Sequence, residues 1–395
     1  MKFSKPQFVG EKQSLENRVE YVRGVTYKAA VDLHEELDEN GYVLLRANNI
    51  QEGELRFDDV QYVDRTKVKP KQLLRRGDIL FCASSGSKGL VGKAALVRES
   101  MPVTFGAFCC VLRPKGNEAE YLGHYFQSRQ YRRAIEEVCS GSNINNLKAA
   151  NFLSLIVPNY DGDSTRAISA LFDLIDAQVK QAKDQIAQLD FLVKSRFVEM
   201  FGDPVANPKG WDVSTIKKTA ITYGDGPFGS NLKSADYVPS GVRVIRLGNI
   251  MCGEFSEKDQ SYVSYEKFES LRKYECIPGE VVIATLGNPI LRACIVPDFG
   301  VPSIHKADCM YYETNKEMVL PVFAMCAINH LSMLQRALLD SHGQTRARIN
   351  STQAGNLPMI LPPMDLQQEF AAFVSQVDKS RFAWRAHMQL RVLAL

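Results

Sequence analysis

Hydrophobic and polar positions follow the same order twice along this chain, half a chain apart. The stretch GYVLLRANNI at residues 41–50 returns as GVRVIRLGNI at 241–250, and RGDILF at 76–81 returns as PGEVVI at 278–283. In each copy a short run of Val, Leu and Ile follows a turn residue, which is typical of a β-strand. A recurrence of this kind indicates a duplicated domain. The expected strands are 43–45 and 79–81 in the first copy, and 242–245 and 281–283 in the second.

Two later segments recur in the same order and extend the duplication. KAALV at 93–97 matches RACIV at 292–296, and INNLKAANFLSLIVP at 144–158 matches INSTQAGNLPMILPP at 349–363. The last match sets the first Ile-Asn pair opposite the second. No single match is convincing, but their common order is hard to credit to chance.

A different period appears from residue 164 to residue 201, a segment without Gly or Pro. Its apolar residues recur every three or four positions, which predicts a long amphipathic helix with a near-heptad seam. Asp163 or Ser164 is expected to cap the start of this helix, and Gly202 to end it. The expected seam residues are Ile168, Leu171, Ile175, Val179, Ala182, Ile186, Leu189, Val193, Phe197 and Met200.

A second helix is predicted after the second copy, because residues 366–380 begin with the same apolar spacing. The seam blurs near the C-terminus, where Ser380 or Arg381 is expected to interrupt it. We therefore keep a truncated or altered end of this helix as one interpretation.

The predicted fold class is α+β, with two repeated mixed domains and two long helical segments. The domains are residues 1–160 and 204–363, and the helical segments are residues 161–203 and 364–395.

Composition narrows the class of protein. Hydrophobic residues make up 45% and charged residues 24%, which is typical of soluble globular proteins. The net charge of +3 permits nucleic-acid binding without arguing for it, because dedicated phosphate binders are usually more basic. The N-terminal stretch MKFSKPQFVGEKQ lacks the apolar core of a signal peptide, and no apolar run approaches the roughly 20 residues that span a bilayer. We expect a cytoplasmic protein with no membrane contact.

The usual sites of an enzyme are absent from the sequence. GDGPFG at 224–229 matches a dinucleotide-binding pattern only formally, and SGSKGLVGKA at 85–94 lacks the Ser or Thr that would bind magnesium. HKADC at 305–309 offers one His and one Cys without a partner pair. LPPMD at 361–365 lacks the amide and the aromatic residue of a base-methyltransferase loop. The nine cysteines form no C-x-x-C pair and are expected to be buried and reduced. We predict no catalytic residue, no metal and no cofactor.

These motifs, taken in order, resemble the DNA specificity subunits of type I restriction–modification systems, and the resemblance covers nearly the whole chain. It implies that residues 1–160 and 204–363 are target-recognition domains, each reading one half of a split, asymmetric site in double-stranded DNA. It also implies that the two helical segments pair as an antiparallel coiled coil and dock two methylation subunits, which restriction subunits can join. The subunit itself would be non-catalytic. The residues that carry the resemblance are Arg46, Asn49, Ile50, Arg246, Asn249 and Ile250, the turns at 76–80 and 278–282, Gly141, Ile144, Asn145, Gly343, Ile349, Asn350 and the helix exit SRFVEMFGDP.

Base-reading residues are expected in polar loops where the two copies diverge, since residues that choose bases should differ between copies. For the same reason Arg46 and Arg246, which recur, are better explained as structural residues paired within their own domain. The basic run at 65–76 is either a solvated face or an edge that contacts phosphate, as Arg132 would also do. The DNA-binding candidates are Ser84, Ser85, Ser87, Lys88, Lys93, Asn143, Asn145 and Asn146 in the first copy, Ser230, Asn231, Lys233, Asn288, Arg292, Gln344, Thr345, Arg346 and Arg348 in the second, and Lys69 and Lys71 as phosphate contacts.

Two alternatives remain at this stage. A stand-alone DNA modification enzyme is disfavoured by the missing catalytic motifs. A tandem protein-binding scaffold without a DNA role is compatible with the loops.

Overall fold

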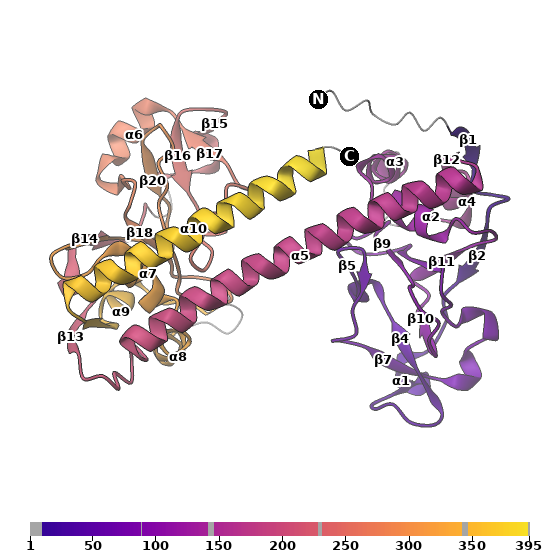
Figure 1. Ribbon diagram of the computed structural model, residues 1–395, viewed down its shortest axis with the longest axis horizontal. Helices are drawn as coiled ribbons and strands as arrows, with labels where there is room; N and C mark the ends of the chain where they lie inside the picture. The colour runs from indigo at the N-terminus through magenta and orange to yellow at the C-terminus, as the bar shows by residue number, and fades with distance from the viewer. Residues whose placement is uncertain (1–9, 88, 141–145, 228–230, 342–346, 394–395) are drawn as a thin grey trace. The chain divides into compact units, whose positions relative to one another are not determined.

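The chain folds into two compact units, Met1–Gln178 and Val179–Leu395, and the division falls within helix α5 (Gly162–Phe201) (Figure 1). We call them the first unit and the second unit. The computed structural model describes residues 10–87, 89–140, 146–227, 231–341 and 347–393.

The first unit contains two four-stranded sheets and two two-stranded pairs. One sheet has the order β10-β4-β7-β3, in which β10 and β4 are parallel and the other neighbours antiparallel. The other sheet, β2-β11-β8-β9, is antiparallel, and β1 pairs with β12 just before α5. The strands are β1 Glu11–Ser14, β2 Val19–Arg23, β3 Leu33–His34, β4 Gly41–Leu45, β7 Gln61–Asp64, β8 Ile79–Cys82, β9 Ala94–Leu96, β10 Val103–Phe105, β11 Cys109–Pro114 and β12 Ile156–Asn159, and a short pair joins β5 Ile50–Gln51 to β6 Glu54–Leu55.

The second unit repeats both four-stranded sheets and the strand pair next to the long helix, and a single bridge between Ile250 and Phe255 stands in place of the β5–β6 pair. Its sheets have the orders β20-β16-β17-β15 and β14-β21-β18-β19, again with one parallel pair, β16 with β20, and β13 pairs with β22. The duplication predicted from the sequence is therefore confirmed, as are the four predicted strands, which are β4, β8, β16 and β18. The strands are β13 Asp212–Thr215, β14 Ala220–Gly224, β15 Tyr237–Val238, β16 Val242–Ile245, β17 Ser261–Val263, β18 Val281–Ala284, β19 Arg292–Ile295, β20 Ser303–His305, β21 Cys309–Thr314 and β22 Pro358–Leu361.

Short helices cover one face of the antiparallel sheet in each unit. Strand β8 is buried along its whole length, and Phe81 on it packs against Phe126 and Phe152 at ring-centroid distances of 4.8 and 5.1 Å. The continuous apolar sequence of β8 follows from this burial on both faces. These helices are α2 Ala119–Tyr125, α3 Arg129–Ser140 and α4 Ala149–Leu153 in the first unit, and α7 Pro321–Ile328, α8 Leu331–Leu339 and α9 Ser351–Gly355 in the second. Helix α6 (Tyr265–Leu271) packs on the other sheet of its unit, and α1 (Ala29–Asp32) directly precedes β3.

The turn before β8 recurs before β18 with the same chemistry. Gly77 and Gly279 have φ of +89° and +90°, a left-handed conformation that favours glycine. The next residue closes the turn in each unit, because the carboxylates of Asp78 and Glu280 accept main-chain N–H groups at 2.8 and 3.0 Å. The Gly-Asp and Gly-Glu sequences therefore form the same turn in both units.

One predicted equivalence is wrong by three residues. The N–H of Leu147 donates to the carbonyl of Ala83 at 2.7 Å, and the N–H of Ile349 donates to the carbonyl of Thr285 at 3.0 Å. Leu147 is thus the counterpart of Ile349, in place of Ile144, which lies outside the described residues. Each unit therefore has a buried apolar residue at this position, but the Ile-Asn pairs of the two sequences do not occupy equivalent positions.

Helix α5 begins earlier than predicted. It starts at Gly162, and the carboxylate of Asp161 accepts the N–H groups of Asp163 and Ser164 at 3.0 and 2.8 Å. Asp161 is therefore the residue that caps the helix, and the predicted caps, Asp163 and Ser164, donate their N–H groups to it. Gly202, with φ of +78°, follows the last helical residue as predicted.

The predicted seam of α5 is wrong at Leu171, whose side chain is 43% exposed. Its neighbour Phe172 packs on the core of the first unit, with its ring 5.2 Å from that of His124, and His124 lies 3.1 Å from Asp173. The first turns of the helix thus pack against their own unit, on a face different from the predicted seam.

Helix α10 (Met364–Leu393) packs antiparallel against the last turns of α5 within the second unit. Phe370, near the start of α10, lies 5.6 Å from Phe197 near the end of α5, and Arg381, further along α10, lies 2.6 Å from Asp190, further back on α5. The helix itself continues through Ser380 and Arg381. The ion pair of Arg381 with Asp190 stands where the apolar seam was predicted to be interrupted, and it joins α10 to α5.

All nine cysteines are free; most are buried, as expected, but Cys252 is exposed. No single helix in the described part of the chain combines the length and hydropathy needed to cross a bilayer, and α7 and α8 meet that test only as a pair bent by 63°.

Candidate nucleic-acid interface

A short turn after β4 fixes one edge of the candidate surface in the first unit. Asn49 is buried, and its Oδ1 accepts the N–H of Arg46 at 2.8 Å. Its Nδ2 donates to the carbonyls of Arg56 and Asp59 at 2.9 and 2.8 Å. One asparagine therefore closes the turn and fastens the following loop to it. The guanidinium of Arg46 lies 2.8 Å from the carboxylate of Asp59.

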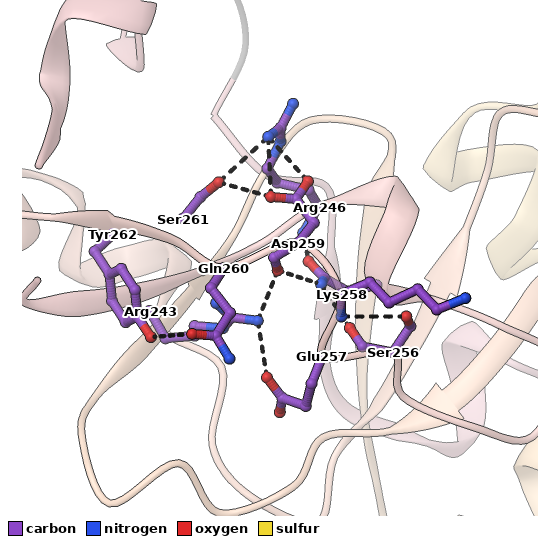
Figure 2. A network of polar contacts seen from close by, with 10 residues as sticks. Arg243, Arg246, Ser256, Glu257, Lys258, Asp259, Gln260, Ser261 and Tyr262 are labelled. Atoms are coloured by element: carbon purple, nitrogen blue, oxygen red, sulfur yellow. Dashed lines mark hydrogen bonds and ion pairs between the residues drawn. The ribbon is translucent and has the colours of Figure 1, made fainter. Parts of the chain in front are cut away.

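The second unit repeats this arrangement after β16. Asn249 accepts the N–H of Arg246 at 2.9 Å and donates to the carbonyls of Ser256 and Asp259, both at 2.8 Å. Figure 2 shows Arg246 directed at Asp259 and Ser261, and the ion pair with Asp259 measures 2.9 Å. The prediction that Arg46 and Arg246 pair within their own domains is confirmed.

The side chains that hold the loop after this turn differ between the units. Arg243 is 1% exposed and donates to Glu257 at 3.1 Å and to the carbonyl of Asp259 at 2.8 Å (Figure 2). Its guanidinium also lies over the ring of Tyr262. Val43 and Phe57 hold the corresponding positions of the first unit, so an ion pair in one copy stands where the other has two apolar residues.

A pocket of about 440 Å³ opens beside the Arg46 turn in the first unit. The loop after β8 forms one wall, and Phe108, whose side chain is 70% exposed, forms another. Ser84 is bridged to Asn146 through the main chain, which brings these two segments together. The pocket therefore combines an apolar ring with hydroxyl and amide groups. Its lining residues are Tyr27, Arg46, Ala47, Asn48, Gln61, Ser84, Ser85, Gly86, Gly106, Phe108 and Cys109.

The second unit carries charges at the corresponding positions. Leu286 is bridged to Arg348 as Ser84 is to Asn146, and the guanidinium of Arg348 lies 2.7 Å from Asp308. Asp308 occupies the place of Phe108, since the N–H of Thr285 donates to its carbonyl as that of Ala83 does to Phe108, both at 2.9 Å. Burial raises the pKa of nearby Asp225, and the charge of Asp308 adds to this rise.

The loop that joins β8 to β9 also differs in length from the loop that joins β18 to β19. Phe81 pairs with Ala94, whereas Ile283 pairs with Ala293, so the loop of the first unit is longer by three residues. Arg292 holds the shorter loop, because its Nε donates to the carbonyl of Ile250 at 3.0 Å and its Nη1 to that of Pro289. This geometry suits a positioning residue better than a base-reading one.

Apart from Arg292, the predicted candidates among the described residues fall into three groups. Ser84, Ser85 and Asn146 come together in the first unit, and Asn288 and Arg348 lie on the corresponding loops of the second. Ser87 and Lys93 belong to the longer loop itself. Lys69 and Lys71 are exposed at the short turn Pro70–Gln72, which Lys69 directly precedes, and Asn231 and Lys233 are exposed on the segment before β15. Lys88, Asn143, Asn145, Ser230, Gln344, Thr345 and Arg346 lie outside the described residues.

Arg132, a predicted phosphate contact, is engaged within the protein. Its Nη1 and Nη2 donate to the carbonyls of Val91 and Gly89 at 2.9 and 3.0 Å. It therefore supports the loop after β8. Among the described residues, no three His, Cys, Asp or Glu side chains gather as ligands for a metal ion.

Sequence reasoning missed Phe108 and Asp308, equivalent positions that carry an aromatic ring in one unit and a carboxylate in the other. Both directly precede a recurring strand, at Cys109 and Cys309, and the alignment of those strands would have set them opposite one another. The same alignment would have drawn attention to Asn48 and Gln61, which line the pocket.

Curated relatives match part of the chain. No family model matches it. It is 37% identical over 174 residues to the type I restriction enzyme StySPI specificity subunit of Salmonella potsdam, and 36% identical over 174 residues to the EcoKI specificity subunit of Escherichia coli strain K12. Each match covers 44% of this chain and 37% of the relative, so the chain spans well under half the length of the curated relatives it matches.

Two solved structures share the fold. The S subunit of a type I restriction-modification system from M. genitalium covers 99% of this chain and 95% of its own length, with a TM-score of 0.50 and 14% identity. A chain solved in work on complex assembly and conformational transition of the type I R-M system covers 99% and 96%, with a TM-score of 0.51 and 14% identity. In sequence over part of its length, and in fold over nearly all of it, the chain resembles the specificity subunits of type I restriction–modification systems.

Proposed function

We propose that this chain is a sequence-specific DNA-binding subunit that directs type I methylation and restriction subunits to a bipartite, asymmetric target. Each unit reads one half-site, and the chain itself is non-catalytic. One observation carries the proposal: the same scaffold, closed by Asn49 and by Asn249, presents different side chains in the two units. A fold that keeps its turns and varies one surface is suited to recognising two different ligands.

The side chains on these surfaces suit the edges of base pairs. Hydroxyl, amide and guanidinium groups are the donors and acceptors that read the major groove, and Ser84, Asn146 and Arg348 supply them at corresponding edges. Exposed lysines such as Lys69 and Lys71 would contact phosphate, which positions a protein on DNA without specifying sequence.

The long helices would dock the methylation subunits. Helices α5 and α10 expose large apolar side chains, with Phe191 71% and Phe382 74% exposed. Exposed apolar surface of this kind on a helix pair supports a role in assembly.

Co-expression with a type I methylation subunit, followed by methylome sequencing, tests the proposal. We expect methylation within a sequence that has two different specified halves separated by unspecified bases. Methylation by the chain alone would instead support the stand-alone enzyme. An unchanged methylome, together with purified chain that binds no DNA, would support a protein-binding scaffold.

A further inference from the structure

The two units place chemically different groups at the same two points of one scaffold. Phe108 and Asn146 hold these points in the first unit, and Asp308 and Arg348 hold them in the second. The equivalence rests on main-chain contacts and on no likeness of the side chains. In each unit one position lies directly before a central strand, and the other is bridged to the loop that follows its neighbouring strand.

In the first unit the two groups match an A·T pair. Thymine carries the one apolar group on the major-groove edge, its methyl, and an exposed aromatic ring can pack against it. Asn and Gln bond adenine through two atoms, and Asn146 is bridged to Ser84 beside Phe108. The amides of Asn48 and Gln61, which contact Asp59 and Tyr27, line the same pocket. Of the described residues that line the pocket, the one basic residue is Arg46, which recurs as Arg246 with the same pairing in the second unit and therefore does not distinguish the two half-sites.

In the second unit the two groups match a G·C pair. A guanidinium bonds the O6 and N7 atoms of guanine, and Arg348 is about half exposed. Asp308 is 19% exposed and lies 2.7 Å from Arg348, so a carboxylate fixed by its surroundings orients the guanidinium. Holding the fork in one orientation reduces the entropy lost on binding, and it makes Asp308 a positioning residue.

We propose that positions 108 and 146 in the first unit, and 308 and 348 in the second, determine base identity, so that the first half-site is read at an A·T pair and the second at a G·C pair. This inference rests on the proposed function. It adds the chemical class of base that each unit selects, and the pair of residues that makes the selection.

Selection from randomised duplexes by the full chain, assembled with a methylation subunit, tests the inference. Arg348→Ala should lower the preference for guanine at one position of one half-site roughly 10- to 100-fold and leave the other half unchanged. Arg348→Lys keeps the charge but loses the fork, so it should lower the same preference. Arg272→Ala, which removes an exposed arginine paired with Glu269 at 2.9 Å, is the matched control and should select the wild-type sequence.

The first unit offers the reciprocal test. Phe108→Ala should lose a thymine preference in the other half-site, and Phe108→Leu should keep it, because leucine retains an apolar contact. Asp308→Asn should relax the guanine position while overall DNA affinity is kept, a result that a merely structural role would not give. The double variant Phe108→Asp with Asn146→Arg should change the A·T position to G·C.

The outcomes separate the inference from the proposed function. If the wild type selects a bipartite site while Arg348→Lys and Phe108→Ala select that same site, the inference is overturned and the proposed function stands. If the two variants lose affinity equally for all sequences, these positions contact phosphate and the inference also fails. If the wild type enriches no sequence at all, the proposed function fails and the inference falls with it.

Discussion

Asn249 Nδ2 lies 2.8 Å from the carbonyl oxygen of Asp259. The same contact, at the same length, joins Asn49 to Asp59 in the other unit. A buried amide that satisfies one N–H and two carbonyls is hard to replace. This explains why the Arg-x-x-Asn-Ile motif recurs while the surface residues around it change.

This contact makes a prediction about stability and recognition. Asn49→Ala leaves buried carbonyls and an N–H without a partner and should lower the free energy of unfolding by about 1–3 kcal/mol. Asn48→Ala, at the exposed neighbouring position, should change it by less than about 0.5 kcal/mol while weakening recognition by the first unit. Urea unfolding and DNA selection measure the two effects, and equal destabilisation by both variants would contradict the assignment.

The pH dependence of stability tests a difference between the cores. His305 is fully buried, and burial lowers its pKa to about 4, whereas Phe105 holds the corresponding place in the first unit. The unfolded chain binds this proton below about pH 6.5, so the stability that neutral His305 contributes is present above that pH and is lost as the pH falls towards 4.

His305→Phe should therefore remove part of the acid sensitivity of the second unit. Between pH 7 and pH 4 the variant should lose roughly 3 kcal/mol less than the wild type. Urea midpoints at several pH values give this comparison. If wild type and variant lose stability in parallel, His305 does not stay neutral in the folded protein.

The pairing of α5 with α10 depends on buried aromatic residues. Phe370 is fully buried and lies 5.6 Å from Phe197 and 5.5 Å from Phe201. Phe370→Ala should lower the free energy of unfolding by about 3–5 kcal/mol. Phe382→Ala, on the same helix but 74% exposed, should change it little and should instead weaken assembly with the methylation subunit. Thermal unfolding and co-purification distinguish the two, and a large loss of stability in Phe382→Ala would count against an exposed docking role.

Helix α5 is expected to set the spacing of the half-sites. Seven residues inserted between Gln178 and Val179 preserve the facing stripe and add about 10.5 Å, or roughly 3 base pairs. We expect the unspecified spacer to lengthen while both half-sites keep their bases. A five-residue insertion, which rotates the halves of the helix by roughly 140°, serves as the control and should abolish activity. A spacer of unchanged length in an active seven-residue variant would show that α5 is not the ruler.

Much of the scaffold could be predicted from the sequence, because it depends on local patterns. Residues adjacent in the sequence determine the apolar strands β8 and β18 and the turns at Gly77 and Gly279. The pairing of Asp308 with Arg348 was missed because it joins segments far apart in the chain. Leu171 departs from the prediction because the sequence pattern implies one seam along the whole of α5, whereas the first turns of the helix pack on their own unit.

The most direct test of the central claim, one unit for one half-site, is the methylome of Asn48→Ala and of Arg348→Ala beside that of the wild type. We predict that each variant relaxes positions in one half of the target, that the two variants affect different halves, and that the other half is read as before. If both variants relaxed the same half, or if either changed both halves together, the assignment of a separate half-site to each unit would be contradicted.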